Sequence, residues 1–440
     1  MHEDAYAIAA DIRSGDRRAS EVVAAALARA RTDRSNAVVT ICEAEAVRDA
    51  SAIDRAVANG DDPGPITGVP FTVKDTIATA GVRTTAGSRL YADRIPVADA
   101  SCVALLRSAG AVLIGKTNCP EFALQAYTDN LVFGATVHPD APAMSPGGSS
   151  GGCAAAVASG IVPISIGGDY GGSVRYPAAC TGIYGLRPSR GALDAGGTLP
   201  PPANGTPRDR FQTVGPLARN ARDVTLAFAV LTGTYSTEAA FNRTIGVVYG
   251  GWSVDAAGTR ALERTALAAE HAGYEVKPVA ADPFVRATNV FDAWRATDPY
   301  DDLRELASGR EAELTPHIRS LIAEGSAPRP ADLASIAAEA AEVERVVIAL
   351  LWETPVLLLP VALVGVLALG ATHVEVNGRS DPVDSLRILG PSRAVSLLGL
   401  PAIAIPAGVD ERGLPVGVQL VGRPNAEAEL FSVAQALSTP

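Results

Sequence analysis

The sequence predicts an α/β fold in which a β-sheet is largely covered by helices. Two observations favour this class. Short apolar runs rich in β-branched residues alternate with segments in which apolar residues recur at helical spacing. Hydrophobic residues make up 48% and charged residues 19% of the 440 positions, as expected for a globular protein with a large core. Strands that alternate with helices are typical of a sheet whose faces are both buried.

The first fifth of the chain is expected to be helical. Ser20 is placed to cap a helix over 21–31, and a second helix is expected over about 43–58. The turn-rich segment "NGDDPGPITG" then leads into "VPFTVKDTI", which contains β-branched residues and a single lysine. Strand and helix signals alternate after that, with a strand over 111–118, a small-residue helix over 153–160 and a strand over 162–169.

The segment from about 235 to 350 is rich in alanine and glutamate and is expected to be mostly helical, including a helix over 332–351. The apolar run 354–371 approaches the length of a membrane span. Proline and glycine interrupt it, so we expect a buried strand at 356–359 followed by a covered loop. The closing residues predict two strands, "LPAIAIPAG" and "LPVGVQLVG", and a final helix at 426–437. No repeat or linker divides the chain, so a single domain over 1–440 is expected.

Composition and net charge also limit which partners the protein is expected to bind and where it is expected to reside. A net charge of −11 and a pI near 5.1 offer no basic stripe for a phosphate backbone, which argues against direct binding of nucleic acid. Five scattered cysteines without C-x-x-C spacing indicate reduced thiols. The charged N-terminus has no apolar core of a signal peptide. We therefore expect a cytoplasmic protein that neither enters a membrane nor binds nucleic acid.

Two glycine-rich stretches carry the candidate chemistry: "PGGSSGGC" at 146–153 and "GGDYGGSVRYPAA" at 167–179. Paired glycines allow successive backbone N–H groups to converge on one point and form an anion-binding nest. If such a nest faces a reacting carbonyl it becomes an oxyanion hole, and Ser173 beside it is placed to attack. Neither stretch matches G-x-x-x-x-G-K-[ST] or G-x-G-x-x-G, which argues against a nucleotide site.

A serine nucleophile needs a base. None of the five histidines lies in a recognisable triad motif, the G-x-S-x-G elbow is absent, and no two histidines have metal-ligand spacing. Lysine is the other option. Lys74 is the only charge in "GVPFTVK", whose other residues fit an interior strand; a strand-end lysine that reaches water is the structural alternative. Burial lowers the pKa of a lysine, as a neutral base requires.

These residues resemble the amidase signature family. The resemblance rests on "GVPFTVKDTI", "GKTNCPEFA", "SPGGSSGGCAAAVASGIVPISIGGDYGGSVRYPAA" and "LPAIAIPAGVDERGLPVGVQLVGRP". It implies the amidase signature fold, with one large twisted mixed β-sheet covered by helices on both faces. Residues 60–233 would form the signature core with the catalytic triad. Residues 235–385, which match only loosely, would form a variable, mostly helical region that covers the substrate.

The same resemblance implies roles for individual residues. Ser173 would be the nucleophile, Lys74 the base, and Ser149 the bridging serine, held by a cis peptide bond. Further residues would complete the site: the backbone N–H groups of Tyr170, Gly171, Gly172 and Ser173 as the oxyanion hole, and Ser150, Asp169 and Arg175 as supports. An ordinary structural ion pair is the alternative for the last two. Cys153 and Cys180 lie nearby but are expected to be inert.

No metal or organic cofactor is implied. Within "FALQAY", the residues Leu124, Gln125 and Tyr127 would line the acyl pocket, with helix packing as the alternative. Trp294 and Tyr300 of "FDAWRATDPYDDL" are candidates either for acyl contact or for the core.

The expected function is hydrolysis of a small-molecule amide through an acyl-enzyme, releasing ammonia or an amine. The resemblance suggests a homodimer. Two other functions stay open: that of the amidase component of a glutamyl-tRNA amidotransferase, and hydrolysis of a urea-like or hydrazide bond.

Overall fold

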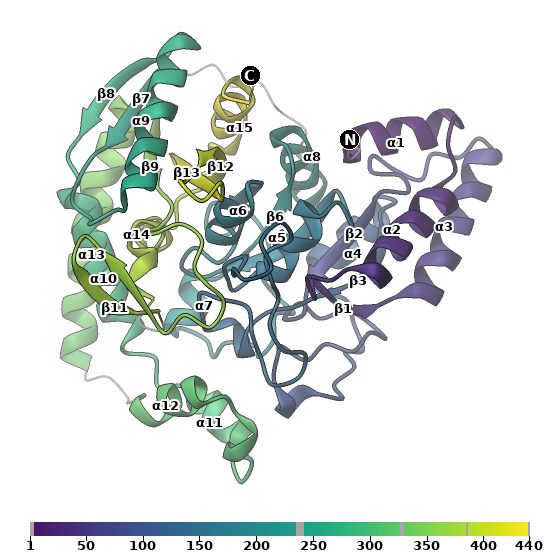
Figure 1. The fold of residues 1–440 in the computed structure, drawn as a ribbon, viewed down its shortest axis with the longest axis horizontal. Coiled ribbons are helices and arrows are strands. Elements are labelled where there is room, and N and C mark those ends of the chain that lie inside the picture. The colour runs from purple at the N-terminus through teal and green to yellow at the C-terminus, as the bar shows by residue number, and fades with distance from the viewer. Residues whose placement is uncertain (1–3, 235–241, 326–329, 384–385, 439–440) are drawn as a thin grey trace.

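The computed structural model describes residues 4–234, 242–325, 330–383 and 386–438, and an 11-stranded mixed β-sheet runs through them (Figure 1). The strand order is β1-β3-β2-β4-β6-β5-β12-β13-β9-β7-β8. A separate two-stranded ribbon pairs β10 with β11. The strands are β1 Val38–Ile41, β2 Pro70–Lys74, β3 Val112–Thr117, β4 Ile164–Asp169, β5 Tyr184–Arg187, β6 Thr213–Ala218, β7 Thr244–Val248, β8 Glu275–Val279, β9 Val356–Pro360, β10 His373–Val376, β11 Arg379–Pro382, β12 Ala402–Val409 and β13 Pro415–Gly422.

Helices pack on both faces of the sheet, as predicted. Alternate residues of β9 show this, because successive side chains of a strand point to opposite faces. Val356 and Leu358 pack into the cluster of α9 and α15, whereas Leu357 and Leu359 pack into that of α10, α13 and α14. The helices are α1 Ala5–Ser14, α2 Ala19–Thr32, α3 Glu43–Ala58, α4 Ser101–Ser108, α5 Gly151–Ala158, α6 Arg175–Thr181, α7 Pro207–Phe211, α8 Ala221–Thr232, α9 Ala256–His271, α10 Asp282–Arg295, α11 Asp301–Ala307, α12 Pro316–Glu324, α13 Pro330–Glu353, α14 Gly390–Leu398 and α15 Glu427–Ala436.

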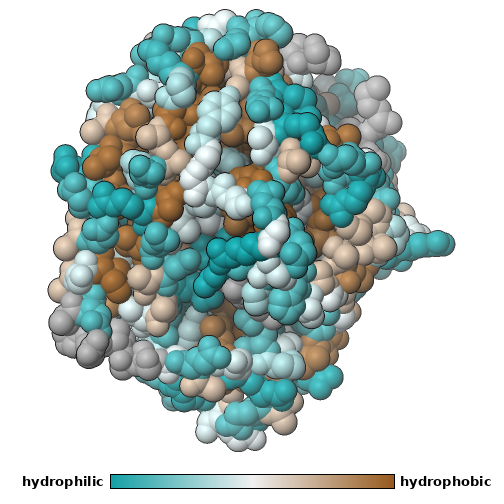
Figure 2. All heavy atoms as spheres, turned by 60° about the vertical axis from the view of Figure 1, so that its left-hand side comes forward, coloured by the Kyte–Doolittle hydropathy of each residue, from teal (hydrophilic) through white to brown (hydrophobic). Residues whose placement is uncertain are grey.

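The run 354–371 forms a strand and a covered loop, as expected. Its strand β9 lies between β13 and β7 in the sheet, and Val361, Val364 and Leu367 of the following loop are buried. None of the helices over the described ranges is long and apolar enough to cross a bilayer. On the face that Figure 2 shows, hydrophobic side chains form separate groups among hydrophilic ones.

The predicted start of the first long helix is wrong. Helix α2 begins at Ala19, and Ser20 lies inside it. The first backbone N–H groups donate instead to Asp54 of α3: Ala19 N lies 2.7 Å from Oδ1, and Ser20 N lies 3.3 Å from Oδ2. A carboxylate from a neighbouring helix therefore caps α2 in place of a local side chain.

The region 235–385 contains helices α9 to α13, but it also contributes strands that the sequence analysis missed. Strands β7 and β8 add a parallel pair at one end of the sheet, next to β9. Residues 235–241, 326–329 and 384–385 of this region lie outside the described residues. The short helices α11 and α12 project from the main body at the bottom of Figure 1. Their apolar residues, including Leu303 and Ile318, pack against Leu90, Phe122 and Leu199.

Candidate active site

The candidate site lies at the carboxyl ends of β2 and β4, which are neighbouring parallel strands. Lys74 is the last residue of β2, and the turn that carries Ser173 follows β4 directly. Ser149 precedes α5, which packs against both strands. Because parallel strands end at one edge of a sheet, residues that are 75 and 24 positions apart in the sequence come together there.

The first pair of the predicted triad is in contact. The Lys74 amine donates a hydrogen bond to Ser149 Oγ at 2.7 Å. Both side chains are almost completely buried, and burial lowers the pKa of Lys74 below its usual 10.5; Cys119, Cys153 and Asp169 oppose that shift. The peptide bond between Gly148 and Ser149 is cis, as the resemblance implied.

Ser173 adjoins this pair through the backbone. The Ser150 N–H donates to Ser173 O at 3.1 Å, so the two serine loops are joined directly. Ser150 Oγ also bonds the Gly168 carbonyl at 3.2 Å. Over the described residues, Ser173 Oγ has no hydrogen-bond partner. No hydrogen bond therefore joins Ser173 Oγ to Ser149 Oγ in this structure. Catalytic hydrogen bonds are often long before substrate binds.

Two adjoining cavities meet at this point. One is lined by Ser173 and Gly171, and we call it the Ser173 cavity. The other is lined by Lys74 and Ser149, and we call it the Lys74 cavity. Four residues line both, namely Ala123, Leu124, Tyr170 and Arg208. A bound molecule can therefore reach Ser173 from one side and the lysine from the other.

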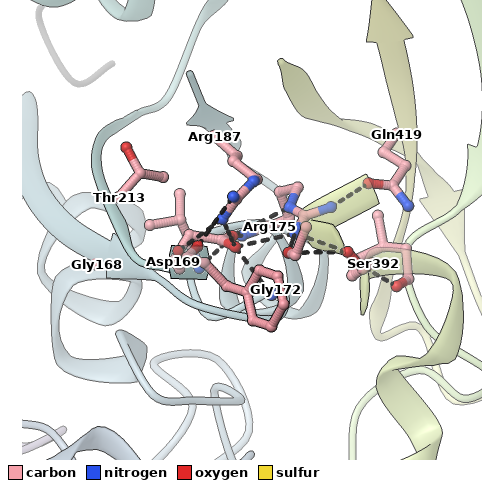
Figure 3. Close-up of polar contacts among 12 residues, drawn as sticks. Gly168, Asp169, Gly172, Arg175, Arg187, Thr213, Ser392 and Gln419 are labelled. Atoms are coloured by element: carbon pink, nitrogen blue, oxygen red, sulfur yellow. Dashed lines mark hydrogen bonds and ion pairs between the residues drawn. The ribbon is translucent and has the colours of Figure 1, made fainter. Parts of the chain in front are cut away.

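The turn before Ser173 is held by Asp169 (Figure 3). Asp169 Oδ1 accepts the Gly172 N–H at 2.9 Å, and Oδ2 accepts the Val174 N–H at 3.1 Å. Gly172 has φ +119°, and a Cβ there would lie 2.7 Å from Ser392 Cβ, so only glycine fits. The N–H groups of Tyr170, Gly171 and Ser173 have no acceptor within the described ranges. Three of the four N–H groups expected to form the oxyanion hole are therefore available to bind an oxyanion, whereas the Gly172 N–H already donates to Asp169.

Two buried arginines bind the same carboxylate. Arg175 reaches Asp169 through Nε at 3.0 Å and Nη2 at 2.9 Å, and Arg187 Nη1 lies 3.1 Å from Oδ1. Burial alone would raise the pKa of Asp169, but the two guanidinium groups outweigh it and hold that pKa well below its usual range. Burial lowers the pKa of Arg187 to about 10. Asp169 and Arg175 therefore both support the turn, and they do so as an ion pair.

The remainder of this network was not predicted from the sequence. Arg175 also donates to Gln419 Oε1 of β13 at 2.8 Å, to Ser392 O at 3.0 Å and to Ser396 Oγ at 2.9 Å (Figure 3). These partners lie more than 200 positions along the chain from Arg175, and no local signal marks them. The network ties the Ser173 turn to the opposite half of the sheet.

We expect Asp169→Asn to lower the free energy of unfolding by about 3–5 kcal/mol, because it leaves two buried guanidinium groups without their counter-charge. Urea unfolding followed by circular dichroism measures this loss. Glu342→Gln is the matched control, since Glu342 pairs with Arg345 on the exposed side of α13. That change is expected to leave the urea midpoint essentially unchanged. A loss below about 1 kcal/mol for Asp169→Asn would contradict the assigned role.

Two of the three residues expected to line the acyl pocket lie in the wall of the Ser173 cavity, and the third does not. Leu124 and Gln125 line the Ser173 cavity, as does Tyr300. Tyr127 lies in a neighbouring pocket, where its hydroxyl accepts a hydrogen bond from Gln125 Nε2 at 2.8 Å. Trp294 packs edge-on against Phe211, with ring centroids 5.8 Å apart.

Other nucleophiles and ligands are less well placed. All five cysteines are buried and unpaired, and burial raises the pKa of Cys153 and brings that of Cys180 to about 12. No histidine of the described part of the chain lines either cavity. Within the described ranges, no three histidine, cysteine, aspartate or glutamate side chains are grouped so that they could hold a metal ion.

Comparison with known proteins agrees with the prediction from the motifs. The profile of the Amidase family matches residues 21–431. The chain is 31% identical to a glutamyl-tRNA(Gln) amidotransferase subunit from Synechococcus sp. (strain CC9605), over 91% of this chain and 88% of that one. It is 41% identical to the corresponding protein from Carboxydothermus hydrogenoformans, but over 49% of this chain and only 45% of that relative's length. A solved structure described as an amidase superposes with a TM-score of 0.90 at 28% identity, covering 99% of both chains. The chain belongs to the Amidase family, the family of amidase signature proteins.

Proposed function

We propose that this protein hydrolyses a carboxylic amide through an acyl-enzyme on Ser173, with Ser149 as the proton relay and Lys74 as the base. The observation that carries the proposal is the contact of 2.7 Å between a buried lysine amine and Ser149 Oγ, beside a serine that lines a cavity. A buried amine of lowered pKa is a competent base only if it is neutral, and burial favours the neutral form.

The proposed reaction proceeds in two halves. Ser173 Oγ attacks the amide carbonyl carbon while its proton passes to Ser149 Oγ, whose own proton passes to Lys74 Nζ. The oxyanion is stabilised by the N–H groups of Tyr170, Gly171 and Ser173. The Lys74 ammonium returns its proton through Ser149 to the leaving nitrogen, and the C–N bond breaks. Water then attacks the ester by the same relay and frees the acid and Ser173.

We expect kcat/KM to rise with pH and then to level off. Since the folded pKa of Lys74 is lowered, the reactive neutral form gains about tenfold per pH unit below that pKa and saturates above it, short of the usual 10.5. Initial rates at constant ionic strength between about pH 6 and pH 10 measure the profile, with circular dichroism as the control for folding. A profile that falls over this interval would contradict a lysine base.

The resemblance and the cavities also support the proposed domain roles. We assign 60–233 to the catalytic core, and 235–385, within a single domain over 1–440, to substrate covering. Tyr300, which precedes α11, and Leu321 of α12 line the Ser173 cavity. These two short helices thus form one wall of the site.

A second candidate is the role for which several relatives are named, that of a component of a glutamyl-tRNA(Gln) amidotransferase. The full-length match to such a component favours it. In that role the chain would release ammonia from glutamine and would act with partner proteins. Hydrolysis of a urea-like or hydrazide bond is a third candidate, since it would use the same acyl transfer.

Ammonia release from a panel of primary amides, ureas and hydrazides tests the function. With an amide substrate we expect ammonia and acid in equal amounts; added hydroxylamine should divert the acyl group to a hydroxamate, because an acyl-enzyme partitions between nucleophiles. Activity on glutamine alone, and only with added partner proteins, would favour the second candidate. No ammonia or amine from any member of the panel would overturn the proposal.

A further inference from the structure

Among the described residues, the Ser173 cavity is lined by three arginines and by no aspartate or glutamate. They are Arg208, Arg295 and Arg393, each from a different helix. A cavity that binds only a neutral amide does not need several guanidinium groups in its wall. Each buried charge requires a partner, so the partner of each arginine indicates what the cavity binds.

Two of the three arginines have partners within the protein. Arg208 binds Asp298 at 2.9 Å and Asp302 at 2.5 Å. Arg393 binds Asp292 at 2.6 Å. Their positive charges are balanced by side chains that do not line the cavity, so these arginines form its walls.

Arg295 differs from both. It is the last residue of α10, is half-buried, and over the described residues its guanidinium has no hydrogen bond or ion pair. Its charge nevertheless reaches the cavity: burial raises the pKa of Tyr170 and Tyr300, and Arg295 acts against both shifts. Five donors in a fixed planar fork thus border the cavity, and none of the described residues supplies them with a counter-charge.

The remaining lining residues indicate the chemistry of a bound molecule between the Arg295 guanidinium and Ser173. Four leucines and an alanine supply apolar wall, namely Ala123, Leu124, Leu321, Leu386 and Leu389. A short run of methylenes fits such a wall.

Building on the proposed function, we infer that the acyl part of the substrate ends in a carboxylate, which Arg295 binds while the amide carbonyl lies at Ser173. The substrate class is then the monoamide of a short dicarboxylic acid. Glutamine fits less well, because none of the described residues that line the cavity offers a carboxylate to its α-ammonium group.

The test compares three amides: glutarate monoamide, pentanamide, which lacks the carboxylate, and glutamine, which adds the ammonium. For the wild type we expect kcat/KM to be about 10- to 100-fold higher for glutarate monoamide than for either of the others, the effect of one charge-assisted hydrogen-bond pair. Monoamides of three- to six-carbon diacids then locate the optimal chain length.

Arg295→Met should remove this preference, so that kcat/KM for glutarate monoamide falls about 10- to 100-fold more than kcat/KM for pentanamide. Arg295→Lys, which keeps the charge, should retain part of it. Arg286→Met is the control, because Arg286 lies on the same helix but pairs with Glu339 at the exposed surface. Independently of any variant, glutarate should inhibit the wild type about tenfold more tightly than pentanoate.

Equal activity on the charged and uncharged amides, or equal inhibition by glutarate and pentanoate, would overturn the inference and leave the amidase proposal standing. An Arg295→Met variant that loses activity on both substrates alike would overturn it too. Absence of hydrolysis of every amide, together with no acyl-enzyme, would instead overturn the proposed function itself.

Discussion

Replacing Ser173 by alanine is expected to lower kcat for amide hydrolysis by about 10⁴- to 10⁶-fold, the loss typical of removing a serine nucleophile. Residual turnover would come from the oxyanion donors and substrate binding alone. Ammonia release under saturating amide measures the effect, with enough enzyme to detect a rate lower by that factor.

The fold of the Ser173→Ala variant should survive. Ser173 Oγ has no hydrogen-bond partner over the described residues, so its removal leaves no protein group unsatisfied. Ser165→Ala is the matched control: Ser165 is a buried serine of β4, the strand that leads to the Ser173 turn, and accepts a hydrogen bond from Thr72 Oγ1 at 2.8 Å. It lines neither cavity. We expect it to lose some stability and to keep kcat within about threefold. If Ser173→Ala stays within tenfold of the wild type, Ser173 is not the nucleophile.

The second large effect is expected for Lys74→Met, which should lower kcat/KM by about 10²- to 10⁴-fold through loss of the general base. The same change should stabilise the fold by about 1–3 kcal/mol at pH 7, because it replaces a buried, desolvated amine by an apolar chain of similar length. Ser149 lines the Lys74 cavity, so water can replace the lost hydrogen bond. Measuring kcat/KM and urea unfolding on one preparation tests both the expected loss of activity and the expected gain in stability.

The stability difference should depend on pH. The pKa of Lys74 is lower in the folded state, so between that pKa and 10.5 the unfolded chain holds a proton that the folded one lacks. Wild-type stability therefore rises with pH across this interval, and the advantage of Lys74→Met shrinks as pH approaches 10.5. An advantage that grows with pH would show that the lysine is buried as a cation.

Lys116→Met is the control for Lys74→Met. Lys116 is also fully buried, on the neighbouring strand β3, and burial lowers its pKa to about 8. It pairs in register with Val73, so it points to the opposite face from Lys74. There it donates to Ile77 O, to Thr79 Oγ1 at 3.1 Å and to Thr84 Oγ1 at 2.9 Å. Its replacement should destabilise the fold, since three buried acceptors lose their donor.

Local sequence was informative where function constrains neighbours along the chain. The lysine at the end of an apolar strand and the glycine–serine loops predicted a base and a serine nucleophile. The resemblance to the amidase signature family added Ser149, and the structure places Lys74 against it. What the sequence could not reveal is the support behind them. Gln419 and Ser392 meet Arg175 only because the sheet brings β13 and α14 beside the Ser173 turn.

The α/β class of the fold was predicted correctly. Individual elements were missed where contacts between distant residues, and not the local sequence, determine them. Strand β8 carries exposed Glu275 and Lys277 at an edge of the sheet, so it lacks the apolar pattern of a strand. The start of α2 depends on Asp54, a residue 35 positions away from Ala19. Tyr127 follows two residues after Gln125, but the chain turns there and its ring lies in the neighbouring pocket.

Mapping a trapped acyl group by mass spectrometry tests the central claim most directly. A substrate-like acylating reagent, rapid acid quench and peptide mapping would show which side chain carries the added mass. The account predicts a single ester on the peptide that contains Ser173, formed faster as pH rises and hardly at all in Lys74→Met. Label on Ser149, on a cysteine or on a peptide without Ser173 would contradict it.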